Sequence, residues 1–191
     1  MPLSQRERLL DAMAQTTARR GYAAASVADV LNVARISRRT FYELFADKED
    51  CFLAAYDEIA TLCGEHAIAA YRAERSWEAG LTRAYAALLG VLAAEPDYAH
   101  LAVVEILAAG PRGLARREAT LRRFTQFIEY TRAHVERTVE PPPVVAEAIA
   151  GGIHELLYSQ IVRGEAHALP ELTENLVHYT FLLLGIERDP A

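Results

Sequence analysis

The sequence has few cysteines, glycines, prolines and tryptophans. Its 191 residues include two, ten, eight and one of these, whereas apolar residues, mostly alanine and leucine, make up 52%. Glycine and proline interrupt regular structure, so long periodic runs without them favour helices, and the composition predicts an all-α protein. The length suffices for one or two domains with a buried core.

Long hydrophobic runs are also missing. No apolar stretch approaches the roughly 20 residues that span a bilayer, and the N-terminus MPLSQRERLL lacks the apolar core of a secretion signal. We therefore expect a cytoplasmic protein without membrane contact. Cys51 and Cys63 lie 12 residues apart with no His or Cys at ligand spacing, which indicates reduced thiols on one helix rather than a disulfide or a zinc site.

The chain has no excess of basic residues, the usual mark of nucleic-acid binding. It carries 20 basic and 26 acidic side chains, a formal charge of −6. Residues 1–50 hold eight basic and seven acidic side chains, a net charge of +1, and residues 51–191 have a net charge of −7. Binding to nucleic acid would have to depend on a local patch in the first fifty residues.

Four helix starts can be predicted from capping residues in those fifty residues. Each is a Ser or Asp followed, in three of the four cases, by an acidic residue three positions on, the spacing of a capping box. The pairs are Ser4 with Glu7, Ser26 with Asp29 and Asp47 with Asp50, and the fourth cap is Ser37. Gly21 is placed to end the first helix.

The remaining chain has the pattern of a helical bundle. We expect helices over residues 77–93, 95–109, 114–139, 144–164 and 170–185, with Gly110-Pro111 closing the second of these and Pro141-Pro142-Pro143 as a break.

The two short helices that begin near residues 27 and 38 have the spacing of a helix-turn-helix. In such a motif the second helix presents its N-terminal side chains to the major groove, where arginine pairs bidentately with guanine. An arginine pair alone is usually a solvated helix face, so the prediction depends on the whole pattern. The predicted DNA contacts are Ser26, Arg35, Ser37, Arg38, Arg39, Thr40, Tyr42 and Lys48.

Residues 7–57 resemble the tetracycline-repressor (TetR) family of bacterial regulators. The resemblance rests on a Gly-Tyr turn, a Ser-Val-x-Asp helix start, Ser-x-x-Thr-Phe-Tyr-x-x-Phe, and a Lys-Glu at the next start. It implies a three-helix DNA-binding domain over 1–48 and an effector-binding and dimerisation bundle over 49–191. It also implies a homodimer on an inverted-repeat operator in double-stranded DNA and a small-molecule effector.

The chain departs from the family pattern at the inter-helix turn. Arg35 stands where the family usually has glycine, so we expect strain if the backbone φ is positive there. Leu31 is bulkier than usual, and Thr16-Thr17 replaces a common Leu-Phe pair. One hypothesis is that Leu31 and Val33 fill the volume lost at Thr17.

Polar and aromatic side chains recur on the apolar helices between residues 51 and 140. For any one of them, a core position with a satisfied hydrogen bond is the simpler interpretation, but the resemblance implies that some line an effector pocket. The candidates are Tyr56, His66, Tyr85, His100, Glu105, Phe124, Phe127 and Tyr130. No catalytic set and no metal-ligand spacing stand out, so we expect neither an enzyme nor a cofactor.

Two apolar stripes near the end of the chain predict a dimer interface, with burial inside the monomer as the alternative. Their residues are Ile149, Ile153, Leu156, Leu172, Leu176, Tyr179 and Leu183.

The sequence thus favours a TetR-like repressor that a small molecule releases from DNA. Two alternatives stay open: a helical enzyme or small-molecule carrier with a vestigial helix-turn-helix, and a DNA binder without an effector.

Overall fold

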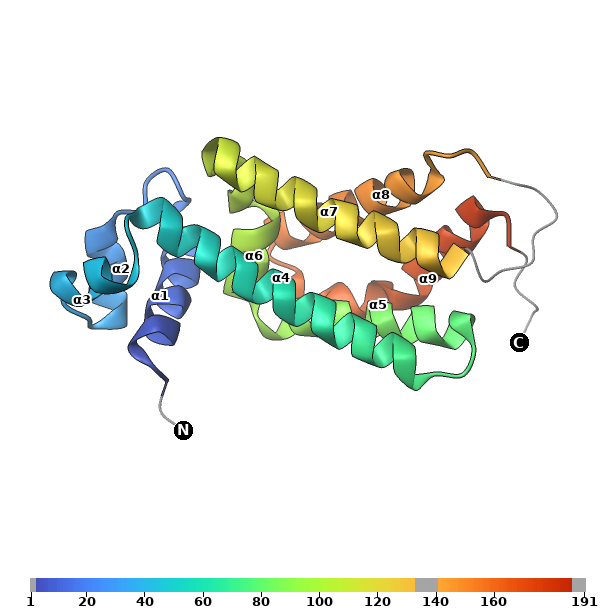
Figure 1. Ribbon diagram of the computed structural model, residues 1–191, viewed down its shortest axis with the longest axis horizontal. Helices are drawn as coiled ribbons and strands as arrows, with labels where there is room; N and C mark the ends of the chain where they lie inside the picture. The colour runs from blue at the N-terminus through green and yellow to red at the C-terminus, as the bar shows by residue number, and fades with distance from the viewer. Residues whose placement is uncertain (1–2, 133–140, 187–191) are drawn as a thin grey trace. The chain divides into compact units, whose positions relative to one another are not determined.

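The computed structural model describes residues 3–132 and 141–186. In these two ranges the chain forms nine α-helices and two 3-10 helices and no strand (Figure 1). The all-α prediction is therefore confirmed. Within the described ranges no helix combines the length and the apolar character needed to cross a membrane.

The first four helices begin where their caps predicted. The Ser4 and Ser26 side chains each accept the N–H three residues on, and the carboxylates of Glu7 and Asp29 accept the cap N–H groups in return. Ser37 accepts the Thr40 N–H. The helices are α1 (Gln5–Arg20), α2 (Val27–Ala34), α3 (Arg38–Leu44) and α4 (Lys48–Ala73).

The chain divides into two compact units. Unit 1 comprises Met1–Thr61 and Glu95–Arg117, and unit 2 comprises Leu62–Ala94 and Glu118–Ala191. Unit 1 therefore holds α6 (Pro96–Val103), the 3-10 helix η1 (Glu105–Ala108) and the start of α7 (Gly110–Arg132) together with the first three helices. The functional division at residue 48 stays a prediction, since it concerns roles rather than packing.

The core of unit 1 joins α1 to the helix-turn-helix and to α6. Leu9, Met13, Phe41, Phe52 and Leu101 are all fully buried there. Burying a side chain of this size contributes about 1.5–3 kcal/mol relative to leaving it exposed, so this cluster fixes α3 against α1.

The burial of Thr17, Leu31 and Val33 bears on the hypothesis that the two apolar residues fill the volume lost at Thr17. Thr17 is fully buried and its hydroxyl donates to the Met13 carbonyl at 2.8 Å. Leu31 packs against the unit 1 core, but Val33 is 41% exposed. The hypothesis that Val33 helps to fill this site is therefore wrong, because its side chain points to solvent.

Unit 2 is built around α5, which packs against α9 and the 3-10 helix η2, while α8 packs against α9. A Cβ at Gly152 on α8 would overlap the Tyr179 hydroxyl of α9, so glycine permits the close approach of these helices. The elements are α5 (Trp77–Ala94), α8 (Val145–Val162), η2 (Ala166–Leu172) and α9 (Thr173–Leu184).

Two predicted helix boundaries in the second half of the chain are wrong. Gly110-Pro111 does not close a helix but opens α7, because proline fits the first turn of a helix, where its missing N–H has no intrahelical partner. The last helix begins at Thr173 and not at residue 170, since η2 occupies the preceding residues. The predicted end of the helix over 114–139 lies outside the described residues.

Candidate nucleic-acid interface

The turn between α2 and α3 has the strained backbone that the sequence predicts. Arg35 has φ 53° and ψ 48°, and among the residues that the structure describes it is the only non-glycine with positive φ. The Ile36 N–H bonds the Leu31 carbonyl at 3.3 Å, the long bond of a Schellman helix end, in which glycine usually takes the left-handed position. An arginine therefore occupies a glycine conformation.

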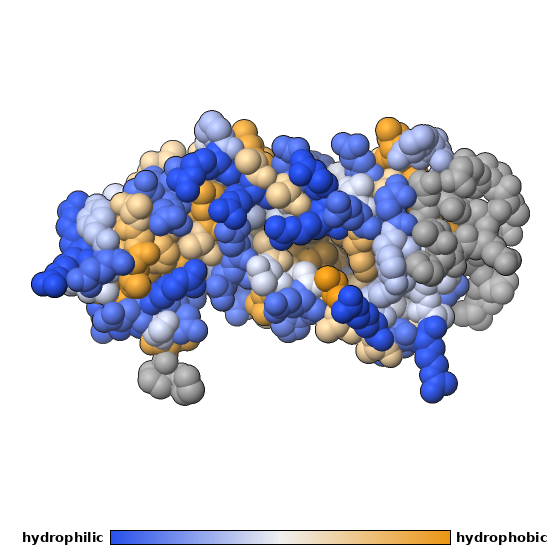
Figure 2. Space-filling model, in the orientation of Figure 1, coloured by the Kyte–Doolittle hydropathy of each residue, from blue (hydrophilic) through white to orange (hydrophobic). Residues whose placement is uncertain are grey.

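Helix α3 has one buried and one exposed face. Phe41 is fully buried, whereas Tyr42 is 49% exposed and the Arg39 side chain 89% exposed. Arg39 Nε lies 2.8 Å from a Glu43 carboxylate oxygen, and the Arg38 guanidinium lies over the Tyr42 ring at 5.7 Å. Figure 2 shows hydrophilic side chains over the part of unit 1 that α3 occupies. The predicted base-contacting arginines are thus accessible on the outer face.

The N-terminus of α2 carries a second set of predicted contacts. Ser26 is exposed and caps the helix, and its hydroxyl lies 2.6 Å from Asp29. Arg20 reaches the same carboxylate at 2.6 Å. Hydrogen bonds from the Ser26 side chain and backbone, with the nearby Arg20 charge, lower the pKa of Asp29 below its ordinary value. The α2 N-terminus is therefore held in place before any ligand arrives.

Lys48 already has partners inside unit 1. Its Nζ donates to the carbonyls of Tyr22 and Ala25 at 2.8 and 2.9 Å and lies 4.2 Å from the centre of the Tyr22 ring. An ammonium group has three N–H donors, so one of them is left for another acceptor. The sequence placed Lys48 at a helix start but gave no sign of these carbonyl contacts.

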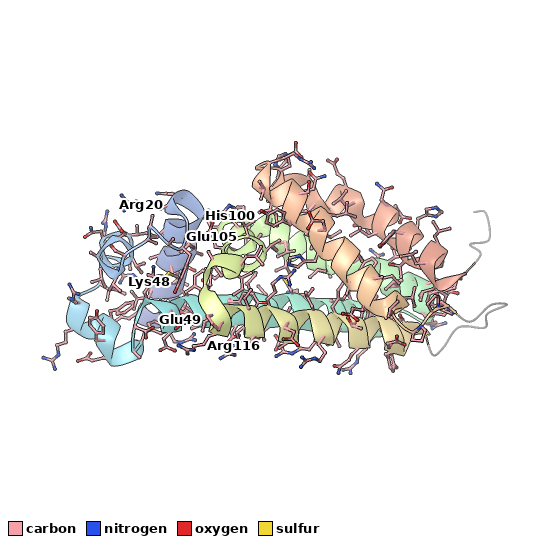
Figure 3. All side chains as sticks on the ribbon, turned by 90° about the horizontal axis from the view of Figure 1, so that it is seen from above. Arg20, Lys48, Glu49, His100, Glu105 and Arg116 are labelled. Atoms are coloured by element: carbon pink, nitrogen blue, oxygen red, sulfur yellow. The ribbon has the colours of Figure 1, made fainter. Side chains whose placement is uncertain are left out.

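Glu105 and His100, predicted as effector contacts, lie beside the turn that precedes α2 (Figure 3). A Glu105 carboxylate oxygen accepts the Tyr22 backbone N–H at 2.5 Å, and His100 Nδ1 lies 3.8 Å from the other oxygen. The Glu105 side chain is 14% exposed. Its carboxylate thus holds the helix-turn-helix domain to η1, a contact that sequence reasoning missed.

Three further contacts tie residues 95–117 to the first helices of unit 1. They are Tyr98 to Asp11 at 2.8 Å, Arg112 to Glu49 at 2.9 Å and Arg116 to Asp57 at 2.8 Å. No local sequence signal predicts pairs that are this far apart in the chain.

The other predicted effector residues divide between the units. Tyr56 belongs to the unit 1 core, and His66 is exposed with its Nδ1 2.9 Å from the Leu62 carbonyl. In unit 2 the buried Tyr85 hydroxyl lies 2.8 Å from Thr180 Oγ1. Burial raises the pKa of Tyr85 above its ordinary value. Tyr56 and Tyr85 are thus buried core residues. This is the alternative to a pocket position that the sequence left open for each of them.

The remaining predicted effector residues take part in aromatic contacts within unit 2. The Tyr71 ring packs edge-on against Phe127 at 5.2 Å and Tyr130 at 6.2 Å, and Phe124 lies 6.1 Å from the Tyr85 ring. Sequence reasoning missed Tyr71. Tyr71 also packs closely against Gly80, where a Cβ would come within 2.9 Å of the ring.

The predicted dimer residues differ in exposure. Ile149, Ile153 and Leu176 are buried within unit 2. Leu156 is 44% exposed, and Leu172, Tyr179 and Leu183 are partly exposed. On α9 the neighbouring Leu182 is 67% exposed.

Helices α1 to α3, with a tight turn before an exposed Arg-Arg-Thr helix, define a DNA-binding transcriptional regulator of the helix-turn-helix class. Residues 9–55 match the family described as bacterial regulatory proteins, tetR family. The match covers the helix-turn-helix part of the chain and confirms the resemblance found in the sequence. The family consists of regulatory proteins, in agreement with the prediction that the chain is not an enzyme.

Solved structures of bacterial regulators share the whole fold. FadR of Bacillus halodurans, a fatty acid degradation regulator, has a TM-score of 0.83 at 17% identity, covering 100% of both chains. FadR of Bacillus subtilis, in complex with stearoyl-CoA, has a TM-score of 0.79 at 16% identity over 95% of this chain and 99% of that one. PfmR of Thermus thermophilus has a TM-score of 0.67 at 21% identity over 98% and 100%. No curated protein matches the chain.

Proposed function

We propose that this regulator is a homodimeric cytoplasmic repressor that binds an inverted-repeat operator and leaves it when a small molecule binds. The observation that carries the DNA-binding part is the two-faced helix α3. Phe41 anchors it in the core, and Arg38 and Arg39 are exposed on the outer face. Arginines at the N-terminus of a recognition helix are suited to guanine edges in the major groove.

The predicted contacts on α3 and at its N-terminus, other than the two arginines, suit the DNA backbone. Tyr42 is half-exposed one turn after Arg38, and Ser37 and Thr40 lie at the N-terminus of α3. Hydroxyls and helix N-termini are common phosphate partners. In this proposal Arg38 and Arg39 read bases, and Ser26, Arg35 and the α3 hydroxyls fix the register.

Exposed apolar residues on α8 and α9 support a dimer. Leu156 and Leu182 expose 44% and 67% of their surface, and Val162 exposes 53%. The buried Ile149, Ile153 and Leu176 serve the core of unit 2 itself. The proposed interface is therefore the outer surface of these helices, and a two-fold dimer presents two copies of α3 to a two-fold operator.

A long-chain acyl thioester is the first effector to test. FadR of Bacillus subtilis was solved with stearoyl-CoA. This chain offers chemistry of the same kind, because α7 is rich in arginine, with Arg122 and Arg123 exposed, and unit 2 has an apolar interior that includes Tyr85 and Leu89. Arginine suits phosphate groups and an apolar interior suits an acyl chain.

Selection of duplexes from a random pool tests the proposal. The expected result is an inverted repeat whose half-sites lie about one helical turn apart. Stearoyl-CoA should then raise the melting temperature and weaken operator binding, because coupling between two sites is reciprocal. Free coenzyme A and stearate are the controls for the two halves of the ligand. Enrichment of no sequence would contradict operator binding, and tighter binding with stearoyl-CoA would contradict release.

A further inference from the structure

The strained turn at Arg35 is held by a side chain from outside the helix-turn-helix. Arg8 lies in the first turn of α1, and its Nη2 donates to the Ala34 carbonyl and, at 3.3 Å, to the Arg35 carbonyl. The Ala34 carbonyl is the last of α2 and the Arg35 carbonyl follows it directly, and no intrahelical N–H reaches either of them. A cation at this helix end also complements the helix dipole.

The two carbonyls that Arg8 contacts belong to the peptide groups on either side of the Arg35 Cα. The Ala34 carbonyl turns with φ of Arg35, and the Arg35 carbonyl turns with ψ. One nitrogen that bonds both oxygens therefore restrains both backbone angles of this residue. Arg35 needs such a restraint, since its left-handed conformation is unfavourable for a residue with a Cβ.

Only two residues separate Arg35 from α3. Ile36 and Ser37 lead directly to Arg38, the first residue of the recognition helix. If Arg35 relaxed to a right-handed conformation, the direction of α3 relative to α2 would change. The arginines on α3 can reach base edges only from a defined direction.

We propose that Arg8 is a positioning residue for operator recognition: it replaces the glycine that this turn lacks by clamping Arg35 in the left-handed conformation. This inference rests on the proposed binding of α3 to an operator. It makes Arg8 necessary only while residue 35 carries a Cβ. With glycine at position 35 the same conformation is accessible without help.

The test is a double-mutant cycle in three backgrounds at position 35: the natural Arg35, Arg35→Ala and Arg35→Gly. In each background Arg8→Met is compared with Arg8 for binding to a selected operator and to a random duplex. Arg35→Ala removes the side chain but keeps the Cβ, so it separates backbone strain from any DNA contact of Arg35. Helix content by circular dichroism checks that every variant is folded at the assay temperature.

We expect Arg8→Met to weaken operator binding on the order of tenfold in the natural and Arg35→Ala backgrounds and less than about twofold in the Arg35→Gly background. Random-duplex binding should change less than about threefold. Arg6→Met is the matched control, because Arg6 lies in the same turn of α1 and pairs with Glu58 at 3.5 Å instead.

Equal losses from Arg8→Met in all three backgrounds would overturn the clamp, since a direct phosphate contact or a general loss of stability does not depend on a Cβ at residue 35. If Arg8→Met does not fold in the natural background, recovery of folding by Arg35→Gly but not by Arg35→Ala supports the clamp, and failure in all three contradicts it. A natural protein that does not prefer the selected operator over random DNA would instead contradict the proposed function.

Discussion

The Glu105 carboxylate and the Tyr22 backbone N–H form a 2.5 Å hydrogen bond within unit 1. The Tyr22 carbonyl is held by Lys48 Nζ at 2.8 Å. One residue of the turn before α2 is therefore restrained through both of its peptide groups, from η1 and from the start of α4. Gly21 next to it has φ 79°, and a Cβ there would lie 3.6 Å from a Glu105 oxygen. The segment that carries η1 is thus bound to the helix-turn-helix.

Loss of the Glu105 carboxylate should loosen this turn. Glu105→Ala leaves a part-buried N–H without a partner, which costs about 1–3 kcal/mol, and the Tyr22 amide should exchange its hydrogen faster by the corresponding factor. Glu105→Gln keeps an acceptor oxygen and should lose less. Glu118→Ala is the control, since Glu118 is 71% exposed and pairs with Arg122 on its own helix. Unchanged protection of the Tyr22 amide in Glu105→Ala would show that another group holds the turn.

The arginines of α3 should carry sequence preference. Arg38→Ala or Arg39→Ala should each weaken binding to the selected operator by about 1–3 kcal/mol and relax the preference at particular base pairs. Binding to random duplexes should fall less. Arg163→Ala, which removes a paired arginine of unit 2, controls for the loss of charge. Equal losses on selected and random DNA would assign both arginines to phosphate.

The helix starts and the strained turn could be predicted because each depends on residues close in sequence. A capping box needs only positions i and i+3, as at Ser26 and Asp29, and the positive φ of Arg35 follows from the glycine that the family has there. Contacts between distant residues have no such signal. Glu105 was assigned to an effector pocket because its helix looked apolar, yet its partner Tyr22 lies 83 residues away.

Apolar periodicity predicts that a stripe is buried but not what buries it. Ile153 and Leu176 belong to the stripes from which a dimer was inferred, and both are covered by their own unit. Leu182, which the stripes did not include, is the more exposed residue at 67%.

Lys48 should contribute to stability more than to DNA affinity. Lys48→Met removes two hydrogen bonds to carbonyls, each worth about 1.5–3 kcal/mol when one partner is charged, so the melting temperature should fall. The slope of operator affinity against salt concentration should stay the same. A slope smaller by about one unit would instead show that the third N–H of Lys48 contacts phosphate. Thermal unfolding and binding at several salt concentrations measure the two effects separately.

Acid should reduce the stabilisation that the Asp29 carboxylate gives to the N-terminus of α2. The pKa of Asp29 is lowered by the Ser26 hydrogen bonds, so its carboxylate stabilises the folded state fully above the unfolded pKa of 3.8. This stabilisation is lost as the pH falls through the lower folded-state pKa. Asp29→Asn should reduce the difference in melting temperature between neutral pH and pH near 3. If wild type and variant respond equally to acid, the capping box does not contribute to the pH dependence.

The proposed dimer should depend on the exposed leucines of α8 and α9. The double variant Leu156→Glu, Leu182→Glu places two carboxylates on surface that is 44% and 67% exposed in one subunit, so the subunit itself should fold normally. At a dimer interface the same charges would be buried without partners, which is strongly unfavourable. Sedimentation should therefore show monomers, and operator affinity should fall because the two half-sites are no longer bound together.

Leu176→Glu is unsuitable here, since Leu176 is 1% exposed and a charge there would unfold unit 2. Leu114→Glu on α7 makes the same change at a residue that is 48% exposed and should leave the assembly intact. A double variant that sediments as a dimer would place the interface on another surface.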